Sequence, residues 1–404
     1  YWLTVLGYPV STTQAIVGAI IGWDLFAGAL IDFGALNKVV LSWFVSPVLA
    51  AIFSALLYKL IAFGMMHVRI NMFRLDSFTR TSLLIAGIAG SYSLGANNIA
   101  NVVGIFVPVS PFSDISFLGL FSLNAAQQLF FIGGVAIAVG TFTYGKKVML
   151  TVGEGISELS PVGALVAVLA NAIVLFLFAS QDLESLLLSH GLPAIPLVPV
   201  SSSQAIVGSV IGIGLVKGGR TIRWRVLGEI CGAWVVTPIA AIAMSFIALF
   251  FLQNVFQQKT YIPVEYRLTA QAAQRIQDAG VSFTGLEEIR GKTYSSAYQF
   301  QKALDRIPSL TVQEKSKIIG AAEIDHLVVA SQVINRINDP AITEEQKDAV
   351  ERLRGMTFMH RWELEKAMSE QSPQWRLNPG NKKQNEELMR QMEYVYRLIR
   401  STGQ

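Results

Sequence analysis

A ten-residue motif occurs twice in this chain, and its two copies start 190 residues apart. The copies read Pro9-Val-Ser-Thr-Thr-Gln-Ala-Ile-Val-Gly18 and Pro199-Val-Ser-Ser-Ser-Gln-Ala-Ile-Val-Gly208. Extended to Gly22 and Gly212, they are identical at ten of fourteen positions, and each keeps three consecutive hydroxyl residues. A soluble core has no reason to repeat a hydroxyl triplet inside a hydrophobic run. The motif therefore predicts a duplicated membrane protein whose halves contribute matching polar groups to one central site.

The hydropathy of the chain changes near Gln257. Of the 404 residues, 52% are hydrophobic, and the mean hydropathy of +0.46 is too high for an ordinary soluble protein. Residues 1–256 are mostly apolar, whereas residues 257–404 are rich in charged residues, with apolar ones at three- and four-residue spacing. We therefore expect a multi-pass integral membrane part, embedded in lipid, and a small helical domain outside the membrane. In that domain, Thr343 and Gln346 fit a capping box.

Five segments are candidates for membrane-spanning helices: 37–66, 81–108, 127–142, 160–180 and 226–256. Three glycines, three asparagines and a proline interrupt 81–108, so we expect a broken helix or a hairpin there. Residues 9–22 and 199–216 are short and follow a proline turn, so each is interpreted as a half-helix. Irregular backbone survives in a membrane only where protein or a water-filled cavity satisfies its polar groups. These three places are therefore where a cavity is expected.

The charges of two corresponding loops indicate that the two halves have opposite orientations. The loop 24–36, after the first motif, contains Asp24 and Asp32 and no Lys or Arg. The loop after the second motif is basic, with Lys217, Arg220, Arg223 and Arg225. Because basic loops tend to lie on the cytoplasmic side, these two loops are predicted to face opposite sides of the membrane, as inverted repeats require. A second repeated element, Trp43-Phe-Val-Ser-Pro47 and Trp234-Val-Val-Thr-Pro238, extends the duplication to whole helices.

The hydroxyl triplets are candidates for an anion-binding site. A helix start with several hydroxyls and unpaired backbone N–H groups suits an oxyanion, and the positive end of the helix dipole adds to the attraction. The alternative is that these residues only cap short helices. Two aligned copies in a membrane region favour the binding interpretation. The candidate residues are Ser11, Thr12, Thr13, Ser201, Ser202 and Ser203.

A cluster of amides lies in Gly95-Ala-Asn-Asn-Ile-Ala-Asn101. Asn97, Asn98 and Asn101 can hold an anion through N–H groups or a hard cation through carbonyl oxygens. The alternative is helix packing with interhelical amide hydrogen bonds. Three asparagines in an apolar segment are costly unless they are used, which favours a role in binding. We therefore predict that all three bind an ion, either an anion or a hard cation.

Several classes of protein are disfavoured. No segment brings together a nucleophile, a base and an orienting residue, so the chain is not expected to be an enzyme. The net charge of +4 is spread along the chain and forms no basic stripe with aromatics, so no nucleic-acid partner is expected. No bound metal or organic cofactor is predicted. The one cysteine, Cys231, excludes an intrachain disulfide.

The motifs together resemble those of the inorganic phosphate transporter (PiT) family, whose halves each carry a Gly-Ala-Asn-Asp-x-Ala-Asn signature and a Pro-x-Ser-Thr-Thr turn. The matching segments are Gly95 to Asn101, Pro9 to Thr13, Pro199 to Ser203, the two Trp-x-x-Ser/Thr-Pro elements and Tyr144 to Gly153. The resemblance covers residues 1 to about 256. It implies a symporter that moves phosphate together with Na⁺ or H⁺. By the same resemblance, the hydroxyl turns and the asparagines hold the anion, and the oxygens of Asn97, Asn98 and Asn101 hold the coupling cation.

Three departures from the family pattern bear on this expectation. The first Gly-Ala-Asn-Asp copy would precede residue 1, which suggests an N-terminally truncated chain. The family's aspartate is Asn98 here, which removes a carboxylate from this half and leaves open the identity of the coupling ion. The second hydroxyl turn is all serine and follows an unusual segment from Leu192 to Val198, so another oxyanion such as sulfate remains an alternative.

The predicted fold is an all-α membrane protein built as an inverted-repeat transporter with broken helices or re-entrant hairpins. Its predicted parts are the C-terminal part of a first repeat (1–66), a basic cytoplasmic loop (67–80), a second repeat (81–256) and a helical extramembrane domain (257–404). The predicted function is phosphate symport with Na⁺ or H⁺ by alternating access. The alternatives are transport of another oxyanion, or a transporter-like membrane anchor whose tail binds a protein partner. A homo-oligomer is also considered.

Overall fold

The chain folds into two compact units in a computed structural model that describes residues 2–67, 71–112, 115–117, 121–193, 195–281, 285–334, 336–337, 342–378 and 382–402. The first unit comprises residues 1–23 and 31–251, and the second comprises residues 24–30 and 252–404. The chain passes from the first unit to the second within one helix near residue 24 and within another near residue 252.

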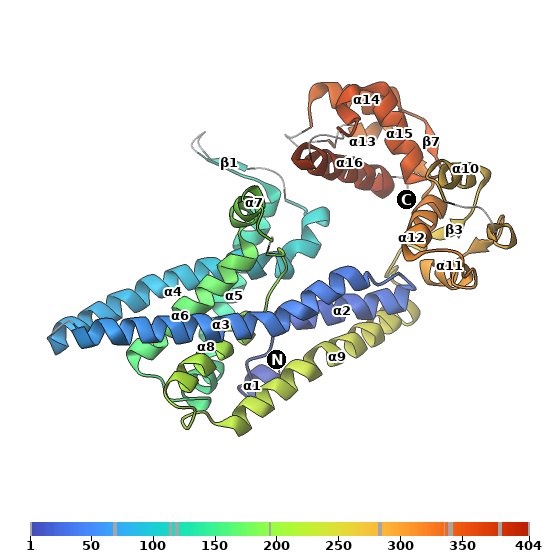
Figure 1. Cartoon of the computed structure of the whole chain (residues 1–404). Helices are drawn as coiled ribbons and strands as arrows, with labels where there is room; N and C mark the ends of the chain where they lie inside the picture. The colour runs from blue at the N-terminus through green and yellow to red at the C-terminus, as the bar shows by residue number, and fades with distance from the viewer. Residues whose placement is uncertain are drawn as a thin grey trace. The chain divides into compact units, whose positions relative to one another are not determined.

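The first unit is built almost entirely from apolar helices (Figure 1). Four of its helical segments are long and apolar enough to cross a membrane, namely Phe33–His67, Ala125–Gly155, Pro161–Ala179 and Trp224–Asn254. Four of the five predicted spans are thereby confirmed as helices of the required length. In order, the elements of this part of the chain are α1 (Trp2–Val5), α2 (Thr12–Ala27), α3 (Phe33–His67), α4 (Met72–Val103), η1 (Gly104–Val109), β1 (Ile115–Phe117), β2 (Phe121–Leu123), α5 (Ala125–Leu150), η2 (Thr151–Gly155), α6 (Pro161–Ala179), α7 (Gln181–Ser189), α8 (Ser202–Val216) and α9 (Trp224–Asn254).

The fifth predicted span differs from its prediction. Residues 81–103 belong to the uninterrupted helix α4, so the expectation of a broken helix or hairpin is wrong for these residues. The helix ends only at Gly104, where a 3-10 segment that contains Pro108 begins. Gly87 and Gly95 face open space and Gly90 makes only an ordinary van der Waals contact, so the neighbours of α4 do not force a break there. Glycine lowers helix propensity by about 1 kcal/mol, which packing along the rest of a long helix can outweigh.

Two predicted loops are also shorter than expected. The asparagine side chain of Asn71 caps α4, so residues 72–80 of the predicted loop 67–80 are helical. Arg69 of that loop lies outside the described residues. In the predicted loop 24–36, residues 24–27 end α2 and residues 33–36 begin α3. The two predicted half-helices are confirmed, because α2 and α8 have 16 and 15 residues and each begins after its proline turn.

The half-helix of each repeat packs against the long helix of the other repeat. A Cβ atom at Gly18 of α2 would lie 2.5 Å from the carbonyl oxygen of Pro238 in α9. At the equivalent position, a Cβ atom at Gly208 of α8 would overlap the carbonyl oxygen of Pro47 in α3. Gly22 and Gly212 meet α9 and α3 in the same manner one turn further along. The repeated glycines are therefore required because the two helix backbones touch.

The second unit contains a buried core and short strands as well as helices, so it is not purely helical as predicted. The capping box of Thr343 and Gln346 is confirmed at the start of α14. The elements of the unit are β3 (Glu265–Arg267), α10 (Ala270–Asp278), η3 (Leu286–Glu288), β4 (Thr293–Tyr294), α11 (Ala297–Leu304), α12 (Val312–Ala322), β5 (Glu323–Ile324), β6 (Leu327–Val328), α13 (Ser331–Ile334), α14 (Glu344–Arg352), β7 (Thr357–Phe358), α15 (Arg361–Gln371), η4 (Pro373–Trp375) and α16 (Lys382–Thr402).

The second unit is itself a tandem duplication that the sequence analysis missed. Glu287-Glu-Ile-Arg-Gly-Lys-Thr293 corresponds to Glu351-Arg-Leu-Arg-Gly-Met-Thr357, and the central glycines, Gly291 and Gly355, both have positive φ angles, of 75° and 79°. In each copy, the strand that follows this turn pairs antiparallel with an earlier strand, β4 with β3 and β7 with β6. Each copy also has its own buried hydrophobic cluster. The unit therefore consists of two similar modules.

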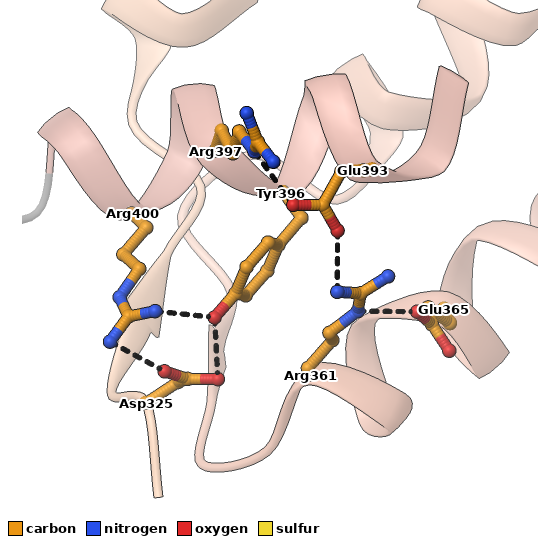
Figure 2. A network of polar contacts seen from close by, with 7 residues as sticks. All are labelled: Asp325, Arg361, Glu365, Glu393, Tyr396, Arg397 and Arg400. Carbon is orange, nitrogen blue, oxygen red and sulfur yellow. Dashed lines mark hydrogen bonds and ion pairs between the residues drawn. The ribbon is translucent and has the colours of Figure 1, made fainter. Parts of the chain in front are cut away.

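A network of charged side chains lies in the second module and at its junction with the first (Figure 2). The hydroxyl of Tyr396 donates to Asp325 Oδ2 at 2.9 Å and accepts from Arg400 Nη1 at 2.9 Å. Arg361 pairs with Glu365 at 2.7 Å and with Glu393 at 2.5 Å. Because the Asp325 side chain is fully buried, its negative charge requires Tyr396 and Arg400 as partners.

Candidate functional site

The two hydroxyl turns have the same local structure at the starts of α2 and α8. Ser11 Oγ accepts a hydrogen bond from Gln14 N at 3.2 Å, and Ser201 Oγ accepts one from Gln204 N at 3.3 Å. Ser11 and Ser201, both of which are buried, therefore cap their helices. The short polar side chain at each helix start satisfies one of the N–H groups that the helix itself leaves unpaired.

The asparagines of α4 join the two turns to each other. Thr13 Oγ1, in the first turn, lies 3.2 Å from Asn98 Oδ1 and 3.4 Å from the carbonyl oxygen of Val200 in the second turn. Asn97 Oδ1 accepts from Val200 N at 3.1 Å. Three segments that are far apart in the sequence, around residues 13, 98 and 200, therefore meet at one buried point.

A cavity of about 730 Å³ opens beside this meeting point. Its lining includes Thr12 from the first turn and Ser202 and Ser203 from the second. Among the described residues, none that lines the cavity is charged, so any ion inside interacts with hydroxyls, amides and backbone dipoles. Each hydroxyl triplet thus contains one buried capping residue and at least one residue that faces the cavity. Thr13 belongs to neither group, because it is buried in contact with Asn98.

Four amide groups of these three segments are buried without a hydrogen-bond partner among the described residues, and none of the four residues lines the cavity. They are the acceptors Gln14 Oε1 and Gln204 Oε1 and the donors Asn98 Nδ2 and Asn101 Nδ2. Buried amide groups left unpaired are costly, and at a polar site they are suited to a ligand. Carbonyl oxygens suit a hard cation, whereas N–H donors suit an anion, so both kinds of ion find matching groups here.

The sequence analysis missed three polar residues in or near the candidate site, namely Gln14, Gln204 and Asn171. Gln14 and Gln204 occupy equivalent positions of the repeated motif, and their repetition was a signal that could have identified them. Asn171 lines the cavity from the apolar helix α6, and its Oδ1 atom is buried without a partner among the described residues. A single asparagine in an apolar helix gave a weaker signal.

A profile of the phosphate transporter family matches residues 1–75, 70–245 and 192–360. The chain belongs to the phosphate transporter family. Membership of this transporter family confirms the resemblance stated from the motifs and the prediction that the chain is not an enzyme. Together with the apolar helices of the first unit, it identifies an integral membrane protein.

Individual relatives agree with this assignment. The chain is 29% identical over 239 residues to a predicted phosphate permease of Methanocaldococcus jannaschii, a match that covers 59% of this chain and 67% of the relative. It is 27% identical to a protein of Rhizobium meliloti named as a low-affinity inorganic phosphate transporter, over 61% of this chain and 68% of the relative.

A solved structure also shares the fold of this chain. The structure of a sodium-dependent phosphate transporter superposes with a TM-score of 0.50 at 22% sequence identity. The superposition covers 63% of this chain and 76% of that protein. The similarity supports the mostly helical fold.

Proposed function

We propose that this chain is a symporter that moves inorganic phosphate across the membrane with Na⁺ by alternating access. Membership of the phosphate transporter family supports the substrate class. The observation that carries the proposal is the junction of Thr13, Asn98 and Val200, because it connects both hydroxyl turns beside the cavity. A site made from both repeats can be exposed to one side and then to the other when the repeats move.

In this proposal, the phosphate is held by Thr12, Ser202 and Ser203 together with the amide donors of Asn98 and Asn101. These hydroxyls line the cavity, and the two donors are unpaired among the described residues. Ser11, Ser201, Thr13 and Asn97 support the site by holding the turns in place. The two turns direct helix N-termini toward the cavity, which favours a multiply charged anion.

The coupling ion is proposed to be Na⁺ rather than H⁺. The unpaired oxygens of Gln14 and Gln204 are amide carbonyls, which coordinate hard cations but do not carry an exchangeable acid proton at neutral pH. The carbonyl oxygens of Asn97 and Asn98 lie in the same buried region, although both already accept hydrogen bonds. Proton coupling remains the alternative outcome of the test below.

The remaining parts of the chain have proposed roles as well. Residues 1–66 and 81–256 form the transporter repeats, and residues 257–404 form a unit outside the membrane. The folded core and tandem modules of that unit suit binding to a protein partner or to a second copy of the chain. Deletion of residues 258–404 is expected to leave phosphate uptake intact. Loss of uptake by well-folded truncated protein would assign the unit a role in transport itself.

Uptake of radiolabelled phosphate by proteoliposomes tests the proposed function. A Na⁺ gradient at equal pH on both sides is expected to drive accumulation, whereas a pH gradient without Na⁺ is not. Accumulation driven only by the pH gradient would assign coupling to H⁺. A tenfold excess of sulfate is expected to leave uptake unchanged, and inhibition by sulfate would indicate a broader oxyanion transporter. Absence of uptake under both gradients would refute the proposal.

A further inference from the structure

Two tryptophans occupy equivalent positions in α3 and α9, yet among the described residues only the indole of Trp234 has a hydrogen-bond partner. Each lies four residues before the proline within its long helix, Trp43 before Pro47 and Trp234 before Pro238. Trp234 Nε1 donates to the carbonyl oxygen of Pro9 at 2.8 Å. Trp43 Nε1 is buried with no partner among the described residues. Sequence equivalence would give Trp43 the carbonyl oxygen of Pro199 as its acceptor.

A serine further along each helix shows the same asymmetry. Ser245 of α9 donates across the helix pair to the carbonyl oxygen of Ala19 in α2, at 2.9 Å. The equivalent Ser54 of α3 donates instead to Ala51 within its own helix, at 3.0 Å. Two side chains of α9 therefore bond to α2 and to the turn before it. Among the described residues, neither of their counterparts in α3 donates to α8 or to the turn before it. The two pairs have matching residues but different hydrogen bonds.

The asymmetric bond acts directly on the candidate site. Pro9 precedes Ser11, Thr12 and Thr13 in the first hydroxyl turn, so the Trp234 indole holds the start of the turn that faces the cavity. An unpaired buried indole N–H in the other half is unfavourable and should be retained only if another conformation uses it. Inverted repeats provide such a conformation, because each repeat can adopt the conformation that the other repeat has in this structure.

We propose that Trp234 and Trp43 are positioning residues that hold the two hydroxyl turns in alternation. In the conformation described here, Trp234 donates to Pro9 and Trp43 has no partner. In the oppositely facing conformation, Trp43 donates to Pro199 and the Trp234 indole is released. Each conformation thus contains one of two equivalent hydrogen bonds, which keeps the two close in free energy. The inference rests on the proposed alternating-access function and specifies the groups that change partners.

The test compares Trp234→Phe with Trp43→Phe in a background in which Cys231 is replaced by serine and cavity-lining Thr141 by cysteine. Phenylalanine keeps an aromatic ring and removes the N–H. In purified protein without phosphate or Na⁺, a polar thiol reagent modifies the cysteine of Thr141→Cys at a measurable rate. This rate reports the fraction of the protein in which the cavity is accessible to the reagent. We expect Trp234→Phe to slow modification about three- to tenfold and Trp43→Phe to speed it by a similar factor, the range expected for one hydrogen bond.

Two further variants and one control sharpen the result. The double variant is expected to return to about the starting rate, because each conformation then lacks one bond. Ser245→Ala removes the second cross-helix bond without changing a ring, so it should slow modification as Trp234→Phe does. Trp224→Phe, at the exposed start of the same helix, should change nothing. A shift in the same direction in both tryptophan variants would overturn the proposal.

The outcome is separable from that of the proposed function. Opposite shifts in accessibility with no phosphate uptake by the Cys231→Ser protein would support the exchange of hydrogen bonds and refute the symport activity. Uptake with equal or unidirectional shifts would support symport and refute the exchange. In uptake by the single variants, an altered equilibrium between the two oppositely facing conformations should change the maximal rate and the apparent KM together. Simple loss of folded protein lowers only the maximal rate.

Discussion

Thr13 Oγ1 lies 3.2 Å from Asn98 Oδ1, and both side chains are buried. This contact joins the first half-helix to the asparagine-rich helix, and the same hydroxyl is 3.4 Å from the carbonyl oxygen of Val200 in the second turn. One hydroxyl thus connects the repeated motifs to each other and to α4. The geometry of the candidate site depends on this connection.

Thr13→Val removes the hydroxyl and keeps the shape of the side chain. We expect kcat/KM for phosphate uptake to fall about tenfold, because the loss of a buried hydrogen bond costs about 0.5–1.5 kcal/mol and leaves Asn98 Oδ1 unpaired. Thr143→Val is the matched control, because the exposed Thr143 hydroxyl bonds only within its own helix. Equal effects of both substitutions on uptake would mean that Thr13 has no special role.

Gln204→Leu removes one of the two glutamine amide oxygens that have no hydrogen-bond partner among the described residues. We expect the Na⁺ concentration for half-maximal uptake to rise about tenfold or more, because a ligand of a hard cation is lost. Phosphate affinity at saturating Na⁺ should change less. Gln258→Leu, at an exposed glutamine outside the site, serves as a control. If Na⁺ dependence is unchanged while phosphate affinity falls, then Gln204 contacts the anion instead.

Gly208→Ala places a methyl group against the backbone of α3, where it would lie 2.6 Å from Pro47 Cα. We expect destabilisation of about 1–3 kcal/mol, because α8 and α3 must move apart. Gly64→Ala has nothing within 4 Å and should be neutral or stabilise its helix by about 0.5–1 kcal/mol. Thermal unfolding of both variants in detergent tests the expectation. A stable Gly208→Ala protein would show that the close approach is not required.

The stability of the second unit is expected to depend on pH through Glu323. Burial, and then the neighbouring Asp325 carboxylate, raise the pKa of Glu323 above its ordinary value, while Arg400 and Arg361 oppose the shift. The folded unit therefore binds this proton more tightly than the unfolded chain. Its stability should fall as pH rises from the ordinary pKa of a glutamate through the raised one.

Amide hydrogen exchange of the intact chain measures this dependence. From pH 5 to pH 8, the exchange rate of amides in β3 and β5 should rise by more than the intrinsic exchange rate of an unprotected amide rises. Glu323→Gln should remove the difference, since the amide does not ionise. Glu287→Gln, at an exposed residue of the same unit, should leave it in place. Persistence of the pH effect in Glu323→Gln would assign it to a group other than Glu323.

Much of the membrane part could be predicted from the sequence. The half-helices followed from a proline, hydroxyls and glycines close together in the chain, and the long helices followed from runs of apolar residues. The asparagines were recognised because amides are costly in lipid. The tandem modules of the second unit were missed, because the matching turn is short and only four of its seven positions are identical. Gln14 and Gln204 were missed because a glutamine near a helix start does not by itself predict ion binding. Its role depends on whether its amide is buried and unpaired, which only the tertiary structure shows.

The sequence by itself determined that this is a duplicated membrane protein and which segments carry its polar groups, because both properties depend on residues near one another in the chain. The tertiary structure decided three further properties. Helix α4 runs unbroken through its glycines, each half-helix packs on the long helix of the other repeat, and the hydroxyls divide into caps and cavity-facing groups. These depend on contacts between segments up to 226 residues apart, such as that of Ser245 with Ala19, which local composition does not specify.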